Sequence, residues 1–521
     1  MSGASRQARF LGLDLGTSGL KALATDARGE TLTCVSQPYP LLCPHPGWAE
    51  QAPAAWWAAL GAALDALRAQ DIALDALDGI GLSGQMHGLV LLDAHGEPLG
   101  PCQTWADSRC EREARAFERR VGRARLLRIA GSHVYTSATA PKLLWMRQHE
   151  PDRLRTAAHL LLPKDEVRFR LTGTLATDVS DASGTLLCDV AARDWSAELV
   201  AAAQVPAGLL PPVVEATAVA GTVNREAART LGLRAGTPVV AGGGDAACAA
   251  VGQGLLGDEA TDRGVALATL GTAGQLFAAT REPCAAPDGA LQTLGHAVPG
   301  RWFVMRSILA GGAAMEWLAS LLAPGTAEEA ANERAATLAA LLAGAADESA
   351  GAGGVLFLPH LDGVRSPRMD PAASGAFVGL GLGTTRARLA RAVIEGVALA
   401  LREGLDAVRA LGIPVERVRL AGGVNSHAPW PQIQASVYGL PVERGTTDDA
   451  SALGAAWLAA AGVGAFTLED AAARIAPRPG DVTLPDPRAA EAYAQLARLH
   501  RSAQRQLRGT FHALHALAPR L

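Results

Sequence analysis

Residues 14–19 read DLGTSG and residues 270–274 read LGTAG, so a similar glycine turn occurs twice, about half the chain length apart. Each copy follows an apolar stretch rich in strand-forming residues. We expect each copy to be a strand that enters a tight turn and returns as the next strand. The repeat predicts two related halves, with a chance match in a Gly- and Ala-rich chain as the alternative.

Helical patterns alternate with short apolar strands around both turns, which predicts an α/β architecture. A chain of 521 residues exceeds the size at which a single core stops growing, about 250 to 300 residues, so we expect two large domains. Residues 240–254, where glycines flank Asp245, are the candidate crossing between them, with a ligand cleft at the hinge. The expected helices are 53–70, 110–130, 385–411 and 451–461, and the expected strands are 79–84, 355–361 and 418–424.

Composition favours an enzyme that acts on small molecules. The 47 basic and 51 acidic residues are mixed along the chain, so no basic surface for nucleic acid or anionic lipid is predicted. The seven cysteines are scattered without a C-x-x-C pair, which predicts neither a disulfide framework nor a zinc site. The sequence shows no signal peptide pattern and no apolar run of the ~18 residues that span a bilayer, so we expect a cytoplasmic protein.

The two glycine turns are candidate phosphate sites. Backbone N–H groups of such turns bind anions, and the hydroxyls of Thr17, Ser18 and Thr272 add donors beside Gly16 and Gly271. Lys21 follows the first turn and is expected to add a positive charge near the transferred group. Asp14 precedes that turn and is expected to hold Mg²⁺ through water, because magnesium keeps several waters. A plain hairpin is the alternative for each turn.

A third glycine element, AGGVN at residues 421–425, follows an expected strand. Its small residues allow a flat base to approach the backbone. The sequence contains no G-x-x-x-x-G-K-[ST] motif, no protein-kinase motif set and no dinucleotide fingerprint in its strand-to-helix context. These classes of nucleotide-binding protein are therefore disfavoured.

Asp245 follows an apolar strand and three glycines, in VVAGGGD at residues 239–245. A carboxylate exposed in a cleft can accept the proton of a substrate hydroxyl as that oxygen attacks phosphorus. A turn or helix N-cap aspartate is the alternative.

A polar cluster in the first half contains SGQMHG at residues 83–88 and WADSR at residues 105–109. A Trp ring can lie against a sugar face, and His87, Asp107 and Arg109 can divide the sugar hydroxyls among them. The alternatives are a buried structural histidine for His87 and a surface ion pair for Asp107 with Arg109.

Taken together, these motifs resemble the FGGY family of carbohydrate kinases, and most closely those members that act on xylulose. SATAPKLLWMRQH at residues 137–149 matches the first family signature, centred on Lys142 and Trp145. GAFVGLGLGTTRARLARAVIE at residues 375–395 resembles the second signature, although Arg388 stands where a polar or acidic residue is usual. The resemblance extends over residues 10–461, nearly the whole chain.

The resemblance implies two ribonuclease H-like, actin-like ATPase domains, 8–252 and 253–510, with the catalytic cleft between them. It implies that Asp245 is the catalytic base and Asp14 the carboxylate associated with Mg²⁺. For the sugar it implies a pocket of Met86, His87, Asp107 and Asp245. For ATP it implies phosphate and nucleotide contacts at Gly16, Thr17, Ser18, Gly271, Thr272, Gly312, Gly422, Gly423 and Asn425.

Two departures bear on the substrate, because Ala246 and Ala106 stand where similar xylulose kinases carry Asn. A lost hydrogen bond shifts selectivity by about 1 to 3 kcal/mol. We expect ATP-dependent phosphorylation of D-xylulose, with another pentulose or polyol as the alternative substrate. An actin-like conformational ATPase and a sugar-binding regulator are rival functions, and a homodimer is the expected assembly.

Overall fold

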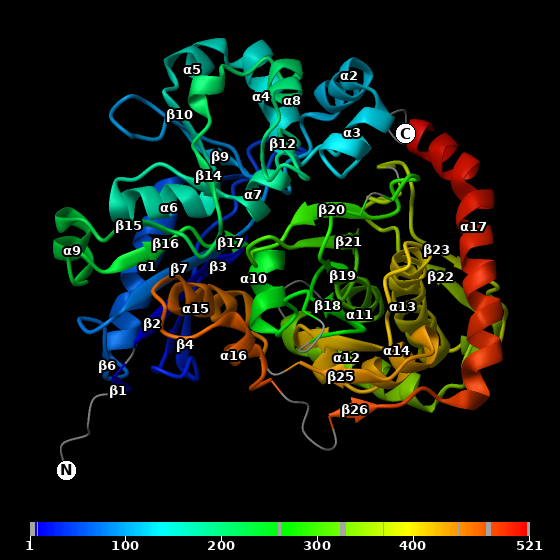
Figure 1. The fold of residues 1–521 in the computed structure, drawn as a ribbon. Coiled ribbons are helices and arrows are strands. Elements are labelled where there is room, and N and C mark those ends of the chain that lie inside the picture. Colours follow the sequence, from blue (N-terminus) through cyan, green and yellow to red (C-terminus); the bar gives the residue numbers. More distant parts are fainter. Residues whose placement is uncertain are drawn as a thin grey trace.

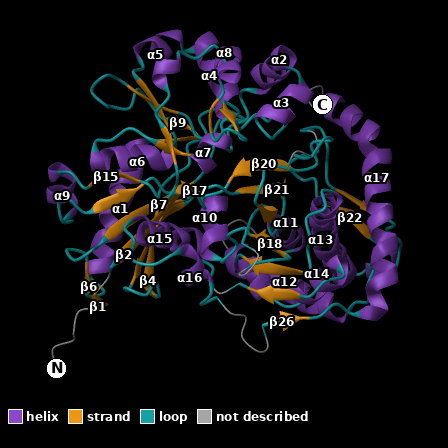
Figure 2. Cartoon of the chain, viewed as in Figure 1, coloured by secondary structure: helices purple, strands orange, loops and turns teal. Residues whose placement is uncertain are grey.

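Two seven-stranded sheets form the centre of the computed structural model, one from each half of the chain, with helices on their faces (Figures 1 and 2). The structure describes residues 6–7, 9–258, 262–284, 286–323, 330–367, 369–445, 447–475 and 481–517. The two-domain α/β class that the sequence predicts is confirmed. None of the helices in these ranges has the length and apolar character that a bilayer-spanning helix needs.

The first sheet has the strand order β15-β16-β7-β2-β3-β4, and β17 also pairs with β7. β2 runs parallel to β7 and antiparallel to β3, so the sheet is mixed. Its strands are β2 (Phe10–Leu15), β3 (Gly19–Thr25), β4 (Thr31–Pro38), β7 (Gly79–Gly84), β15 (Val219–Thr222), β16 (Pro238–Val240) and β17 (Gly243–Gly244).

The second sheet has the order β20-β21-β19-β18-β24-β25-β26. β18 runs antiparallel to β19 and parallel to β24, which repeats the arrangement around β2 in the first sheet. Its strands are β18 (Val265–Leu270), β19 (Gly274–Thr280), β20 (Gln292–Gly295), β21 (Trp302–Ile308), β24 (Arg417–Ala421), β25 (Val442–Arg444) and β26 (Val482–Thr483).

Short strand pairs and helices complete the fold. The pairs are β1 (Arg6–Gln7) with β6 (Ile72–Ala73), β5 (Glu50–Gln51) with β9 (Cys102–Gln103), β8 (Val90–Leu92) with β10 (His159–Leu161), β11 (Thr177–Asp178) with β14 (Val213–Val214), β12 (Cys188–Asp189) with β13 (Asp194–Trp195), and β22 (Leu356–Leu358) with β23 (Ala376–Val378). The helices up to and including the expected crossing are α1 (Pro53–Arg68), α2 (Glu111–Val121), α3 (Arg123–Ile129), α4 (Thr139–His149), α5 (Pro151–Thr156), α6 (Pro163–Thr172), α7 (Val179–Ser183), α8 (Ala197–Ala202), α9 (Arg225–Leu231) and α10 (Asp245–Gly252). Those after it are α11 (Ala313–Leu322), α12 (Ala330–Asp347), α13 (Arg386–Ala410), α14 (Trp430–Tyr438), α15 (Ala450–Gly462), α16 (Leu468–Ala472) and α17 (Ala490–Leu517).

Both glycine turns are confirmed as hairpins. Leu15 pairs with Leu20 across the first turn, and Leu270 pairs with Gly274 across the second.

The prediction of one helical segment over 110–130 is wrong in one respect. The chain forms α2 and α3 there, separated by Gly122 at φ 89°, a conformation that breaks a helix.

Helix α15 belongs to the second half of the sequence but lies on the first sheet, as its orange ribbon beside the blue strands of Figure 1 shows. A Cβ atom on Gly81 of β7 would collide with the carbonyl oxygen of Ala455 in α15. A Cβ atom on Gly454 of α15 would likewise collide with the carbonyl oxygen of Cys248 in α10. Glycine therefore allows α15 to lie in backbone contact with both the sheet and α10.

This contact predicts a stability effect. Gly81→Ala forces α15 away from the sheet, and overpacking of this kind costs about 1 to 3 kcal/mol. We expect the variant to lower the Tm in differential scanning calorimetry by about 5 °C.

Gly509→Ala is the matched control, because Gly509 lies in α17 with no atom within 4 Å of an added Cβ. Its Tm is expected to equal that of the unmodified protein or to exceed it slightly, since Ala favours helix. Equal Tm values for the Gly81→Ala protein and the unmodified protein would contradict the close contact.

Candidate active site

Two carboxylates, Asp14 and Asp245, lie close enough to influence each other electrostatically. Asp14 stands near the end of β2, and Ser83 of β7 donates a hydrogen bond from Oγ to Asp14 Oδ1 at 2.8 Å. Burial raises the pKa of Asp14. Asp245 is the first residue of α10, where burial and the negative charge of Asp14 raise its pKa to about 7. A carboxyl group with such a pKa is suited to general base catalysis near neutral pH.

The first hairpin turns its carbonyl groups toward the protein. Gly16 donates its N–H to the carbonyl of Gly19 at 3.0 Å. Gln51 donates to the carbonyl of Thr17 at 2.6 Å, and the indole N–H of Trp105 donates to the Thr17 hydroxyl at 2.7 Å. The N–H groups of Thr17 and Ser18 donate to no group within the described ranges, so they are available for an anion. Trp105 therefore supports this hairpin. The sequence analysis expected its ring to lie against a sugar and did not anticipate this contact.

The second hairpin has the same property. Gly312 donates its N–H to the carbonyl of Gly271 at 2.7 Å, and Gly311 donates to the carbonyl of Thr272 at 2.8 Å. These bonds join the hairpin to the start of α11. As in the first hairpin, the N–H groups of Thr272 and Ala273 have no acceptor in the described part of the chain.

The glycine element after β24 lies against the second hairpin. Gly422 has φ 90°, and a side chain there would collide with the carbonyl of Leu270. A Cβ atom on Gly312 would lie 2.5 Å from the side chain of Val424. Gly423 has no atom within 4 Å of an added Cβ, so the backbone here is open to a ligand. The structure thus brings together Gly271, Thr272, Gly312, Gly422 and Gly423.

The side chain of Asn425 is bound to other protein groups and does not face an open site. Its Nδ2 donates to the carbonyl of Ala421 at 2.6 Å, and its Oδ1 accepts from Gln434 at 2.7 Å. The side chain is buried, and both of its amide atoms hold the loop in shape.

Lys21 forms an ion pair across the two halves of the chain. Its Nζ lies 2.7 Å from Oδ1 of Asp449, the residue that precedes α15. Ser451, in the first turn of α15, donates its hydroxyl to the carbonyl of Asp245 at 3.2 Å. The start of α15 therefore contacts both the strand after the first hairpin and the candidate base. Sequence reasoning identified Lys21 but missed Asp449, because the pair joins residues far apart in the chain.

The candidate sugar side contains Met86 and His87. Met86 packs on Gly244, where an added Cβ would lie 2.7 Å from Met86 Cγ. His87 adopts φ 72° and is buried, and its Nδ1 lies 2.8 Å from the carbonyl oxygen of Gly184. Burial, then the nearby cation Arg365, lowers the pKa of His87 well below its usual value. His87 is therefore a neutral hydrogen-bonding group at physiological pH.

Residues 137–149, the first family signature, hold the backbone of His87 in place. Lys142 is fully buried, and its Nζ donates to the carbonyls of His87 and Ser137, each at 2.7 Å. Burial lowers the pKa of Lys142 to about 8. These bonds fix His87 in a conformation that is rare for a residue with a side chain.

Asp107 takes part in a buried ion-pair network. It lies 2.6 Å from Arg109 and accepts the N–H of Ala49 at 2.8 Å. Arg109 also pairs with Glu50 at 2.7 Å and lies 3.4 Å from the ring centroid of Trp48. The sequence allowed a surface ion pair for Asp107 and Arg109, but their side chains are only 0% and 2% exposed. Asp107 and Arg109 therefore form an ion pair that is buried, not one on the surface.

Arg365 is the residue of this cluster that sequence reasoning missed. It lies in the segment between β22 and β23, and its Nη2 is 3.4 Å from His87 Nε2. Its guanidinium lies 4.6 Å from the ring centroid of Tyr135, and its charge lowers the pKa of Asp245. Only 8% of the residue is exposed, and within the described ranges no carboxylate pairs with it. The sequence offered no signal, because only the fold brings this segment to His87.

Two domain models of one family match the chain. The N-terminal domain of the FGGY family of carbohydrate kinases matches residues 9–252, and its C-terminal domain matches residues 266–463. A xylulose kinase of Escherichia coli is 39% identical over 451 residues, covering 86% of this chain and 89% of that protein. A xylulose kinase of Bacillus subtilis is 33% identical over 464 residues, covering 89% and 90%.

Solved structures agree with these relatives. The crystal structure of a xylulose kinase from Rhodospirillum rubrum superimposes with a TM-score of 0.85 at 33% identity, over 96% of this chain and 99% of that one. With both halves matched and relatives above 30% identity along most of its length, the chain belongs to the FGGY family of carbohydrate kinases.

Proposed function

We propose that the protein transfers the γ-phosphoryl group of ATP to the terminal hydroxyl of D-xylulose, giving D-xylulose 5-phosphate. The observation that supports this most strongly is Asp245, a carboxyl group with a pKa near 7 that lies close to Asp14 and to Arg365. Relatives named as xylulose kinases along most of the chain support the substrate.

In the proposed reaction, Asp245 accepts the proton of the sugar hydroxyl as the oxygen attacks phosphorus. The free N–H groups of Thr17, Ser18, Thr272 and Ala273 bind phosphate oxygens from two sides. Met86 and His87 contact the sugar, and the Arg365 guanidinium binds a sugar oxygen close to His87.

Asp14 is the proposed partner of Mg²⁺. The Ser83 hydroxyl occupies Oδ1 of Asp14, which leaves Oδ2 for a metal-bound water. The described residues contain no cluster of three or more metal-ligating side chains. Asp14 would hold the ion through water, and the ion would offset negative charge on the phosphates.

The remaining assignments stay predictions from the sequence. These are the boundary between residues 252 and 253, the sugar contact of Asp107, the nucleotide contact of Asn425, the homodimer and the cytoplasmic location. Asp107 and Asn425 already have protein partners for their side chains, so a ligand would exchange for one of them.

The substrate assignment is tested with a panel of pentuloses and polyols in a coupled ADP assay. We expect D-xylulose to give the highest kcat/KM, and ADP release without sugar to be at least about 10²-fold slower. A higher kcat/KM for another sugar would make that sugar the substrate in place of xylulose. Such a result would be explained by Ala246 and Ala106, which lack the amide groups that Asn would offer to sugar hydroxyls. ADP release that is indifferent to every sugar would favour a conformational ATPase.

The role of Asp245 predicts the effect of its removal. Asp245→Ala is expected to lower kcat by at least about 10²-fold, because it removes the carboxylate that accepts the proton in the proposed reaction. ATP affinity, measured by calorimetry, is expected to stay within about threefold, since the phosphate hairpins are untouched. Turnover near that of the unmodified enzyme would remove Asp245 from the mechanism.

The pKa of Asp245 predicts a pH profile. The base form exists above its pKa, so kcat/KM is expected to fall as the pH drops below about 7. Arg365→Gln removes a cation that lowers this pKa, and it is expected to shift the acidic limb upward by about 0.5 to 1 pH unit. Arg365→Lys keeps the charge and is the matched control, with a limb closer to that of the unmodified enzyme. An acidic limb that is identical in all three proteins would contradict the placement of Arg365 beside Asp245.

A further inference from the structure

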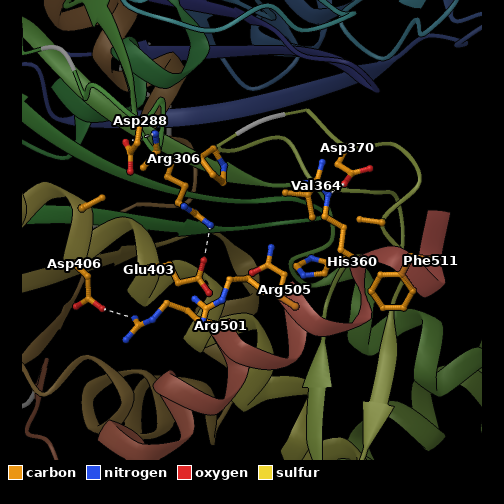
Figure 3. A pocket seen from close by; sticks show the side chains of 16 residues that line it. Asp288, Arg306, His360, Val364, Asp370, Glu403, Asp406, Arg501, Arg505 and Phe511 are labelled. Carbon is orange, nitrogen blue, oxygen red and sulfur yellow. Dashed lines mark hydrogen bonds and ion pairs between the residues drawn. The ribbon is translucent and has the colours of Figure 1, made fainter.

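A cavity of about 540 Å³ lies between α13, α17 and residues 360–367 and 369–373 (Figure 3). This volume is in the range of small-molecule sites, about 300 to 1,000 Å³. No residue given a role in the proposed reaction lines it.

Most charges around the cavity are already paired. The pairs are Arg306 with Glu403 at 2.7 Å, Arg501 with Asp406 at 3.0 Å and Arg508 with Asp370 at 3.1 Å. Two lining charges differ, because neither Asp288 nor the exposed Arg505 of α17 has an ion-pair partner among the described residues. Figure 3 shows Arg505 between Glu403 and His360, with Phe511 beyond the imidazole ring. Among the described lining residues, Arg505 therefore offers a guanidinium without a protein partner at the open side of the cavity.

Other lining groups define the rest of a ligand. The side chain of His360 is buried, and its Nε2 has no hydrogen-bond partner within the described ranges. Glu403, Asp406 and Asp370 line the cavity, and carboxylate oxygens accept hydrogen bonds from hydroxyl groups. Phe511 adds an apolar surface. A guanidinium binds phosphate with paired hydrogen bonds, whereas the carboxylates repel a ligand that is anionic throughout. The lining suits a molecule with one anionic end and a hydroxylated carbon skeleton.

The cavity shares a chain segment with the candidate sugar site. Val364 lines the cavity, and the next residue, Arg365, contacts His87. Val364 and Asp370 exchange two backbone hydrogen bonds, at 2.8 and 3.0 Å, and these hold the two residues together. The Asp370 carboxylate is joined to α17 through Arg508. Contacts therefore connect α17, through Asp370 and Val364, to Arg365.

We propose that this cavity binds a phosphate ester of a small polyol, with its phosphate on Arg505, and that the Val364–Arg365 link couples its occupancy to sugar affinity. The coupling rests on the proposed function, whereas the binding site does not. The ester is either the reaction product or another sugar phosphate, since both have the same chemistry.

Titration calorimetry with D-xylulose 5-phosphate tests the site. We expect two molecules per chain for the unmodified protein, one in the sugar site and one in the cavity. Arg505→Glu is expected to weaken the cavity site at least about tenfold, which leaves one. Arg498→Glu makes the same charge change at an exposed position of α17 outside the cavity, and it is expected to keep two. The same stoichiometry and affinities in the Arg505→Glu protein and the unmodified protein would overturn the site.

Further ligands separate the sources of the ester and the parts of the recognition. D-Ribose 5-phosphate is expected to bind once, in the cavity, if the site accepts esters other than the product, and not at all if it is specific for the product. Inorganic phosphate and xylitol each lack one half of the ligand, and each is expected to bind the cavity at least about tenfold more weakly than the ester. Tight binding of xylitol that survives Arg505→Glu would overturn the placement of the anion on Arg505.

Coupling is measured as the KM for xylulose with and without an ester that binds the cavity. We expect a change of about fivefold or more in the unmodified and Arg498→Glu enzymes, and no change in Arg505→Glu, whose basal kcat stays normal. An unchanged KM with the cavity occupied would overturn the link through Arg365. If the protein phosphorylates no xylulose, the product assignment fails, but loss of one bound ester in Arg505→Glu still supports the cavity site.

Discussion

Backbone contact between α15 and the first sheet is the constraint on which the candidate active site depends. This contact places the start of a helix from the second half of the chain beside the candidate base. Asp449 then reaches Lys21 at 2.7 Å, and Ser451 reaches the carbonyl of Asp245 at 3.2 Å. Glycine at Gly81 and Gly454 makes the contact possible, because any side chain there would collide with backbone. The two halves of the chain therefore meet at a fixed place, and the carboxylates lie there.

Electrostatics at that place follow from burial. Asp14 and Asp245 are held close in a poorly solvated environment, and the proton affinity of Asp245 rises because its ionised form is disfavoured twice. Arg365 and the Ala246 N–H limit this rise, so the pKa stays near 7. Asp245 is thus suited to proton transfer, whereas Asp14 accepts a hydrogen bond from Ser83. The two carboxyl groups differ because their neighbours differ.

Local features of this fold could be predicted from sequence. The two hairpins, β7 and α13 follow from glycine placement and apolar periodicity, which act over a few residues. The break at Gly122 was missed, because a single glycine inside a helical pattern does not reveal its φ angle. Lys21 with Asp449 and His87 with Arg365 are pairs from distant segments, and periodicity carries no information on which loops meet. The motifs therefore identified most of the candidate site, but the cations and acids that tune it needed the fold.

The central claim is that two hairpins bind one triphosphate while Asp245 faces the sugar hydroxyl. A crystal structure with D-xylulose and a non-hydrolysable ATP analogue measures this most directly. The account predicts phosphate oxygens within hydrogen-bonding distance of the N–H groups of Thr17 or Ser18 and of Thr272 or Ala273, with the terminal sugar hydroxyl on Asp245. Phosphates away from either hairpin, or a sugar that does not contact Asp245, would contradict it.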